Sequence, residues 1–158
     1  MTCTPVAATP ESFRDFGKVF KIPKDAPLAQ TKDFSYWSNV VSYNIAGETE
    51  IGWCTVYRND PAEVGGVERH MRTPEVLIPV DAPFILPVMQ DAPGNAPLKA
   101  FRVEVGEAIV IGDGVWHGAC LPVGKPASSY FVIFRKGTPQ EDVEKKQIDP
   151  VRIAGLLE

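Results

Sequence analysis

The sequence predicts an all-β domain, built as a sandwich or barrel of short strands. Fifteen prolines and thirteen glycines divide the 158-residue chain into short segments, and no segment in its middle is both long and helically periodic. Stretches rich in aromatic and β-branched residues recur between turns that carry Pro, Gly, Asp or Asn. Because a chain of this length is typical of one domain, we expect residues 1–158 to form a single domain with one site.

The N-terminal third is predicted to contain a short helix, a loop and a hairpin. Thr9 is suited to an N-cap with Pro10 at the first helical position, and Gly17 follows the expected end of the helix. Residues 21–33 are polar and contain two prolines, which indicates a loop. Residues 34–45 and 51–58 are rich in strand-forming residues and are separated by "AGETE", so we expect them to pair as a hairpin.

Short strands and turns are predicted to continue from residue 67 to residue 134. We expect apolar sheet faces from the regions of Val41, Val56 and Phe101. The tail from Pro139 is charged and is expected to be partly helical, with a last short helix after Asp149, and to pack outside the sheet. The expected strands are Val67–Met71, Val76–Val80, Phe84–Met89, Lys99–Val105, Ala108–Ile111 and Tyr130–Phe134.

The composition argues against several classes of partner. The net charge is −4, and no stripe of Lys or Arg could neutralise phosphates, so we expect no nucleic acid partner. The N-terminus lacks the pattern of a secretory signal and no apolar run has the length of a membrane span, which favours the cytoplasm and no membrane. Three cysteines without metal-finger spacing suit free thiols in a reducing compartment.

The chain has only two histidines, and both have neighbours that could complete a metal site. Glu68 and His70 are two residues apart, so on a strand they point to the same face. Glu75 can join them only if the chain turns at "RTP", and His117 must come from a different strand. Such a set of two imidazoles and two carboxylates suits a divalent ion such as Zn, Mn, Ni or Fe. The alternative is a surface His70 beside solvated glutamates and a His117 that packs against Trp116.

Two segments that contain these histidines resemble the two motifs of the cupin superfamily. The segment "ERHMRTPE", residues 68–75, resembles the first motif, H-x-H followed by Glu, with Glu68 in the place of the first His. The segment "GEAIVIGDGVWH", residues 106–117, resembles the second motif, which brings a distant His after a Gly-rich turn. The resemblance implies a double-stranded β-helix of the jelly-roll group, with a divalent metal ion held by Glu68, His70, Glu75 and His117.

Further segments are similar to the ureidoglycolate lyase family within the cupins. They cover nearly the whole chain: "ESFRDFGKVF", "VYRNDP", "ERHMRTPEVLIPV", "VWHG" and "SYFVIFRKG". The chain departs from the family pattern at Glu75, where Gln is usual, at Gly118, where a second His is usual, and at Phe134, where Asp is usual. The resemblance implies a homodimer that cleaves ureidoglycolate to glyoxylate and urea in allantoin and purine degradation. A divergent cupin remains the alternative: a small-molecule binding module, or an isomerase or dioxygenase acting on a sugar or keto acid.

The resemblance also implies roles for individual residues in binding a small hydroxy acid. Glu68 and Glu75 are the candidate general base and acid, with His117 beside them.

Arg58 and Arg135 are the candidates to bind the substrate carboxylate, although plain surface positions remain open for both. Trp116 is a candidate pocket wall at the substrate. Arg69 should point away from the site. Cys120, three residues after His117, should not share its face, so we do not expect a thiol nucleophile there.

Overall fold

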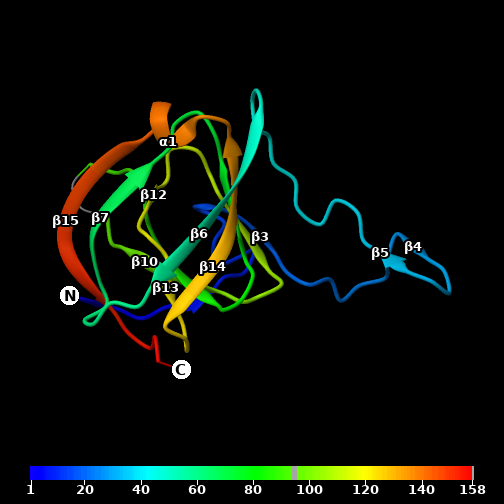
Figure 1. Cartoon of the computed structure of the whole chain (residues 1–158), viewed down its shortest axis with the longest axis horizontal. Coiled ribbons are helices and arrows are strands. Elements are labelled where there is room, and N and C mark those ends of the chain that lie inside the picture. Colours follow the sequence, from blue (N-terminus) through cyan, green and yellow to red (C-terminus); the bar gives the residue numbers. More distant parts are fainter. Residues whose placement is uncertain (94–95, 158) are drawn as a thin grey trace.

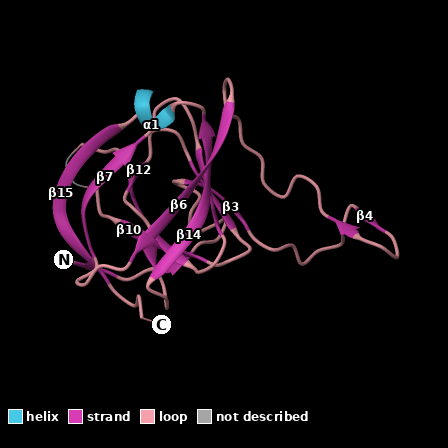
Figure 2. Cartoon of the chain, viewed as in Figure 1, coloured by secondary structure: helices cyan, strands magenta, loops and turns pink. Residues whose placement is uncertain are grey.

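The computed structural model describes residues 1–93 and 96–157, and almost all of its regular structure is strand. Two sheets face each other and curl into a barrel, from which one long extension projects (Figure 1). The single helix in the described residues, α1 (Thr138–Glu141), lies at one end of the barrel (Figure 2). The predicted all-β fold class is confirmed.

The larger sheet has eight strands. Their order is β1-β15-β7-β12-β9-β10-β2, with β13 paired to β9, and the pairs β1–β15 and β2–β10 are parallel. The bounds are β1 Thr2–Cys3, β2 Val6–Ala7, β7 Glu63–Arg69, β9 Phe84–Met89, β10 Lys99–Val103, β12 Trp116–His117, β13 Leu121–Pro122 and β15 Glu144–Ile153.

The second sheet has five antiparallel strands in the order β3-β11-β8-β14-β6. From β7 onward the chain moves repeatedly between the two sheets, as it does in jelly-roll barrels such as the cupins. A two-stranded sheet of β4 and β5 lies on the extension. The bounds are β3 Gly17–Phe20, β4 Ala29–Gln30, β5 Ser35–Tyr36, β6 Thr49–Tyr57, β8 Glu75–Pro79, β11 Ala108–Ile111 and β14 Ala127–Arg135.

The main apolar core lies between the two facing sheets. Leu86 and Val103 of the larger sheet and Leu77 and Ile109 of the smaller one are almost completely buried there. The predicted apolar regions around Val56 and Phe101 contribute to this core, with Val56 at its margin. Burial of this apolar surface is the main force that holds the two sheets together.

The six strands predicted between residues 67 and 134 are all present. Phe84–Met89 and Ala108–Ile111 have the predicted bounds. The largest differences are that β7 begins four residues earlier than predicted and β14 three residues earlier. The added residues include Gly66 and Ala127, which have little strand propensity of their own and are ordered by pairing with β15 and β6.

The predicted N-terminal helix is wrong, because residues 10–16 form turns instead. The Phe13 amide donates to the Thr9 carbonyl at 3.1 Å, but the chain then follows its aromatic side chains into the core, where the Phe13 ring packs edge-on against Phe101 at 5.0 Å. Gly17 does not end a helix either. It allows β3 to approach β11, since a Cβ at Gly17 would lie 1.8 Å from the Val110 carbonyl oxygen.

The predicted hairpin of residues 34–45 and 51–58 is also wrong. Strand β6 pairs along its whole length with β14, seventy or more residues away, because that pairing completes the five-stranded sheet. Residues 37–48 form no strand, and Ser35–Tyr36 pairs with β4 instead. Val41 lies in this part of the chain and contributes nothing to either apolar core.

The predicted terminal helix after Asp149 is wrong as well. Apart from α1, the tail forms β15, which pairs with β7 on one side and with β1 on the other. Val151 and Ile153 alternate with exposed residues and are buried, which is the period-two pattern of a half-buried strand. The tail is therefore part of the larger sheet and not a layer outside it.

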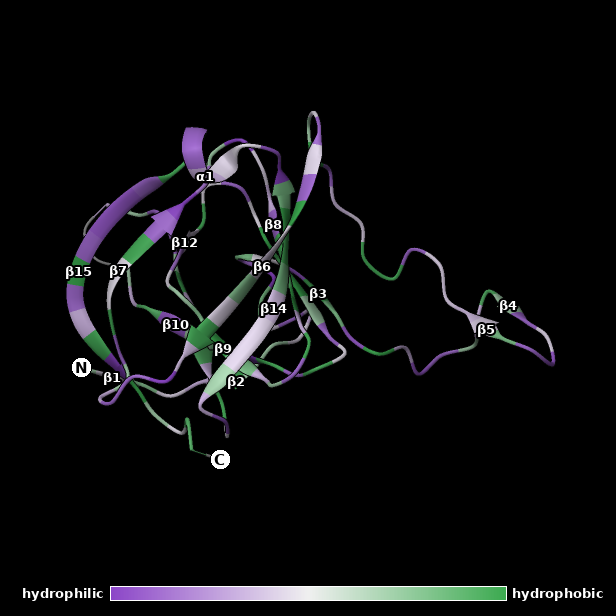
Figure 3. Cartoon of the chain, viewed as in Figure 1, coloured by the Kyte–Doolittle hydropathy of each residue, from purple (hydrophilic) through white to green (hydrophobic). Residues whose placement is uncertain are grey.

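Residues 21–48 leave the barrel as the extension (Figure 1). Hydrophobic stretches occur along it (Figure 3), and Ile22, Leu28 and Phe34 have more than half of their surface exposed. Patches of this kind on a monomer usually mark an interaction surface. Within the described residues, no helix is long and apolar enough to cross a membrane.

The first prediction concerns the core between the sheets. Phe101→Ala should lower the free energy of unfolding by about 3–5 kcal/mol, because it removes a buried ring that packs against Phe13 and Phe16. Leu157→Ala, a truncation of an exposed side chain, should leave it almost unchanged. Chemical denaturation followed by circular dichroism measures both. An equal loss in the two variants would contradict the described core.

Candidate metal centre

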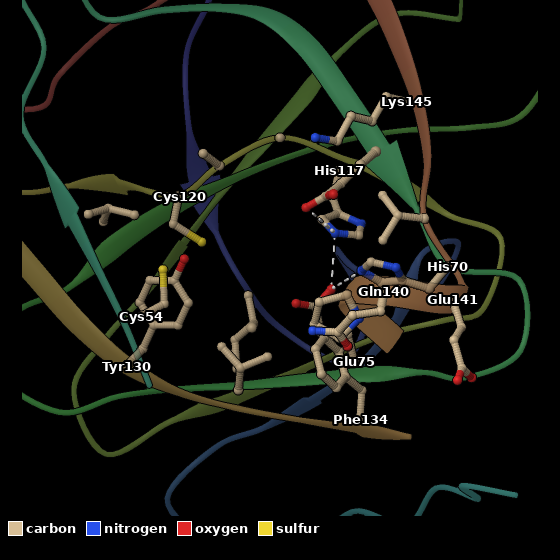
Figure 4. A pocket seen from close by; sticks show the side chains of 18 residues that line it. Cys54, His70, Glu75, His117, Cys120, Tyr130, Phe134, Gln140, Glu141 and Lys145 are labelled. Atoms are coloured by element: carbon tan, nitrogen blue, oxygen red, sulfur yellow. Dashed lines mark ion pairs between the residues drawn. The ribbon is translucent and has the colours of Figure 1, made fainter. Parts of the chain in front are cut away.

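One end of the barrel encloses a cavity of about 730 Å³ between the two sheets. Residues 139–141, of which the last two are labelled in Figure 4, line it from α1. The four predicted metal ligands line this cavity. They come from β7 and the residue after it, from β8 and from β12: Glu68, His70, Glu75 and His117. Their positions follow from strand pairing and from one turn.

Cross-strand pairing places the first ligands on one face. His117 of β12 lies directly opposite Glu68 of β7, so both side chains project to the same side. His70 follows the last residue of β7. The chain then crosses to the other sheet through the predicted turn, and Glu75 is the first residue of β8. On one straight strand His70 and Glu75, five residues apart, would point to opposite faces. Because the chain changes sheet between them, both can point into the cavity.

Buried Thr73 holds the turn in place. Its hydroxyl donates to the Pro74 carbonyl at 2.7 Å and accepts a hydrogen bond from the Arg135 amide at 3.0 Å. The turn is thereby attached to the end of β14, which fixes where Glu75 enters the cavity.

The ligand atoms converge on the carboxylate of Glu75 (Figure 4). Its Oε2 lies 3.2 Å from Nε2 of His70 and 3.0 Å from Nε2 of His117. Glu68 Oε1 is 4.0 Å from the same His117 nitrogen, and the ligand atoms of Glu68, His70 and His117 all lie within 4.8 Å of one another. The structure therefore brings all four predicted ligands together.

Hydrogen bonds at the far side of each imidazole orient the two rings. Nδ1 of His70 lies 2.8 Å from the Asp142 carbonyl oxygen, and Nδ1 of His117 lies 3.2 Å from that of Val115. A carbonyl oxygen can only accept, so both Nδ1 atoms donate and both Nε2 atoms face Glu75. Metal-binding histidines in proteins are commonly oriented in this way.

The charges of the centre are coupled. Burial alone would raise the pKa of Glu75, but His117 and His70 outweigh it and lower the pKa to about 2. Burial also opposes the charge on His70, yet the neighbouring Glu75 carboxylate leaves the pKa of His70 above its ordinary value. Glu75 is therefore ionised at neutral pH. Metal binding displaces protons from such imidazoles, because the ligands must be deprotonated.

Two polar atoms of the centre lack a hydrogen-bond partner among the described residues. They are Oε2 of Glu75 and Nε2 of His117, which are buried and 3.0 Å apart but not aligned for a hydrogen bond. Buried polar atoms are almost always hydrogen-bonded, so atoms that converge without a hydrogen bond leave a place for another partner. A divalent ion fits them, because two imidazoles and two carboxylates form a ligand set accepted by Zn, Mn, Ni and Fe.

The predicted substrate-binding residues do not line this cavity. Arg58 lines a different cavity beside the C-terminal residues and donates to the Lys125 carbonyl at 3.0 Å. Arg135 ends β14 outside the cavity lining. Trp116 lies on the outer face of the larger sheet, where the Arg69 guanidinium stacks 4.4 Å from its ring centroid. Strand alternation explains this, since Trp116 precedes the inward-facing His117.

The expectation that Cys120 faces away from His117 is wrong. Strand β12 ends at His117 and the chain bends through Gly118, so Cys120 also lines the cavity, on the wall with Cys54 and Tyr130 (Figure 4). Burial raises the pKa of the Cys120 thiol well above its ordinary value. A protonated, buried thiol is a poor nucleophile, so Cys120 belongs to a neutral polar wall of the cavity.

Sequence reasoning missed Asp142 and Lys145. The Asp142 carboxylate accepts hydrogen bonds from the amides of Met71 and Arg72 at 2.9 Å each, so the residue holds both His70 and the turn after it. Lys145 lines the cavity from β15. Both residues lie in the tail for which helix was predicted. The alternation of Val151 and Ile153 with polar residues was the signal that could have placed a strand there.

The barrel and its inward-facing histidines and glutamates define a cupin with a candidate metal centre. A model of the family described as ureidoglycolate lyase matches residues 1–154, and the chain therefore belongs to that family. The predicted resemblance is confirmed. No curated protein matches the chain.

Several solved structures are similar to this chain at low identity. Oxalate decarboxylase from Lactobacillus farciminis is 14% identical, with 61% of this chain and 26% of that chain covered and a TM-score of 0.46. The capsular polysaccharide assembling protein CapF from Staphylococcus aureus is 11% identical, with 82% and 32% covered and a TM-score of 0.48.

A dTDP sugar isomerase from Desulfovibrio desulfuricans G20 is 16% identical, with 68% of this chain and 67% of that chain covered and a TM-score of 0.43. The chain thus spans about a quarter of the oxalate decarboxylase and a third of CapF. At these TM-scores the likeness adds nothing to the argument from the sheet topology.

The second prediction concerns metal content. His117→Ala and Glu75→Gln should each lose most of the bound divalent ion, because each removes one of four converging ligands. Asp113→Asn, which changes an exposed acid in the same segment as His117, should keep it. Elemental analysis of the purified proteins measures the ion, and circular dichroism checks that the variants fold. Equal metal in all of them would remove this centre from consideration.

Proposed function

We propose that the protein is a carbon–nitrogen lyase that cleaves ureidoglycolate to glyoxylate and urea. Membership of the ureidoglycolate lyase family supports the reaction, and the converging Glu and His side chains inside the cavity supply a place for it. The convergence on Glu75 is the observation that carries the proposal, because a purely structural barrel has no need for unpaired buried polar atoms.

The substrate carries a hydroxyl, a carboxylate and a urea nitrogen on one carbon. Cleavage requires that the hydroxyl lose its proton, that its electrons form the carbonyl of glyoxylate, and that the C–N bond break toward a nitrogen that gains a proton. Glu68, His70, Glu75 and His117 would hold a divalent ion, which would supply Lewis acidity to the substrate hydroxyl. The remaining requirement is a group that moves the proton.

Glu68 is the better candidate for this proton transfer. Glu75 is buried between two imidazoles and its pKa is about 2, which makes its carboxylate a weak base. The Glu68 side chain is 41% exposed and lies at the edge of the centre, 4.0 Å from His117. We propose that Glu68 uses the carboxylate oxygen that does not hold the ion to accept the hydroxyl proton and donate it to the leaving nitrogen, while His70, Glu75 and His117 hold the rest of the centre.

The opposite wall of the cavity suits the uncharged ureido group. Cys54, Cys120 and Tyr130 gather there (Figure 4). Burial is the main reason that the pKa of Tyr130 lies far above its ordinary value. Burial also raises the pKa of Cys120. Tyr130 and Cys120 therefore stay neutral and can donate or accept hydrogen bonds. A charged group would be poorly solvated at this wall, so the substrate carboxylate should lie elsewhere.

The third prediction is the reaction itself. The metal-reconstituted protein should convert ureidoglycolate to glyoxylate with equimolar urea and no ammonia. Glu68→Gln should lower kcat about 10²- to 10⁴-fold, the usual effect of losing a general acid–base group, whereas Glu63→Gln, an exposed position on the same strand, should not. Urea and ammonia are assayed separately against the spontaneous breakdown of the substrate. Ammonia released in step with glyoxylate would overturn the lyase assignment.

We also propose that the protein acts as a homodimer in the cytoplasm. Its family and its three free cysteines support that compartment. The extension carries exposed Leu28 and Phe34, and a second apolar surface lies on the β6–β14 pair, where exposed Trp53 and Phe131 pack edge-on at 5.1 Å. Two exposed apolar surfaces on one chain support pairing with a second copy.

The fourth prediction tests this pairing. Light scattering should give twice the 17.3 kDa mass of the chain. The double variant Leu28→Asp, Phe34→Asp should give a monomer, because charges on the extension would have to be buried in the interface. Leu157→Asp, also at an exposed leucine, should stay dimeric. A wild-type monomer at high concentration would contradict the dimer.

A further inference from the structure

The cavity has an unbalanced set of charges. Its lining includes three carboxylates, Glu68, Glu75 and Glu141, whereas Lys145 is its one lysine or arginine. An anion that enters such a cavity is repelled by the carboxylates unless a cation pairs with it. The two arginines predicted for this purpose lie outside the cavity lining, which leaves Lys145 as the one lysine or arginine at the site.

Strand pairing directs Lys145 toward the metal centre. Glu68 on β7 lies directly opposite His117 of β12 on one side and Lys145 of β15 on the other. Residues directly opposite on neighbouring antiparallel strands project to the same face, so these three side chains form a row across the sheet. Figure 4 shows the Lys145 side chain beside His117 at the cavity.

The residues on either side of Lys145 confirm this direction. Glu144 forms an ion pair with Arg69 at 2.7 Å, and the Lys146 ammonium lies 4.9 Å from the centroid of the Trp116 ring, both on the outer face. Lys145 stands between them, and alternation turns it toward the cavity opening, where it remains exposed. Within residues 1–93 and 96–157, no carboxylate lies within ion-pair distance of the Lys145 ammonium, and its side chain donates no hydrogen bond.

We propose that Lys145 binds the carboxylate of the substrate and thereby makes the site select negatively charged small hydroxy acids over their neutral analogues. This inference rests on the proposed function, since it names the group that recognises the substrate of the same site. An ammonium on a flexible four-carbon stem can follow the carboxylate from the solvent into the cavity. The neutral wall of Cys54, Cys120 and Tyr130 then receives the uncharged end of the molecule.

The test compares glycolate with its neutral analogue glycolamide on the metal-loaded protein. Isothermal titration calorimetry measures the affinity of both for wild type, Lys145→Met, Lys145→Arg and Lys146→Met. Lys145→Met should weaken glycolate binding about 10- to 100-fold, as expected for the loss of a charge-assisted hydrogen bond, and leave glycolamide binding unchanged. Lys145→Arg should retain most of the glycolate affinity.

Lys146→Met is the matched control, because it removes the same charge from the adjacent residue on the outer face. It should bind glycolate as wild type does. Higher ionic strength should weaken glycolate binding to wild type and to Lys146→Met, but much less to Lys145→Met. Equal losses in the two methionine variants would mean that only net charge matters, and would overturn the proposal.

Two further measurements separate this proposal from its alternatives. Metal content and melting temperature should be the same in Lys145→Met and wild type, and a loss of metal would instead show that Lys145 supports the centre. With ureidoglycolate, Lys145→Met should raise KM more than it lowers kcat. Selective glycolate binding through Lys145 without any turnover would refute the proposed reaction alone, whereas turnover with an unchanged KM in Lys145→Met would refute the role of Lys145 alone.

Discussion

The buried carboxylate of Glu75 is the constraint on which the site depends. It enters from the smaller sheet and meets two imidazoles from the larger one, at 3.2 Å and 3.0 Å. A buried charge is tolerated only when opposite charges or hydrogen bonds compensate it. The two histidines supply part of that compensation and lower the Glu75 pKa, but two atoms remain unpaired. The same contact that joins the sheets at this end of the barrel therefore also offers oxygen and nitrogen atoms to a cation.

The C-terminal segment completes the centre from outside the two motifs. Asp142 fixes the His70 ring through its carbonyl and the following turn through its carboxylate, and three residues later Lys145 faces the cavity. Because Lys145 of β15 pairs directly with Glu68 of β7, the strand pairing fixes the position of Lys145 relative to the centre. The tail thus sets both the orientation of a ligand and the charge at the cavity.

The sequence predicted those parts of the structure that depend on local patterns. His70, Glu75 and His117 belong to motifs with defined spacing, and strands such as Ala108–Ile111 carry a continuous apolar, largely β-branched run. The prediction failed where a distant partner decides the structure. Residues 51–58 pair with β14 and not with the segment just before them, and β15 is ordered by β7 and β1 despite its charged composition. Tertiary pairing of this kind overrides local propensity.

The helix predicted for the tail also explains why the sequence indicated no cation at position 145. Arg58 and Arg135 come from segments that resemble the family, whereas Lys145 is visible only when β15 is placed beside Glu68. The charges around the metal centre explain why a cation at Lys145 would matter for binding an anionic substrate. The carboxylate ligands of the centre would offset the charge of a divalent ion, so the centre would polarise an oxygen with little net field to attract anions. Glu141 adds another negative charge to the lining. A separate cation then has to attract the substrate carboxylate. Lys145 is the cationic side chain that lines this cavity.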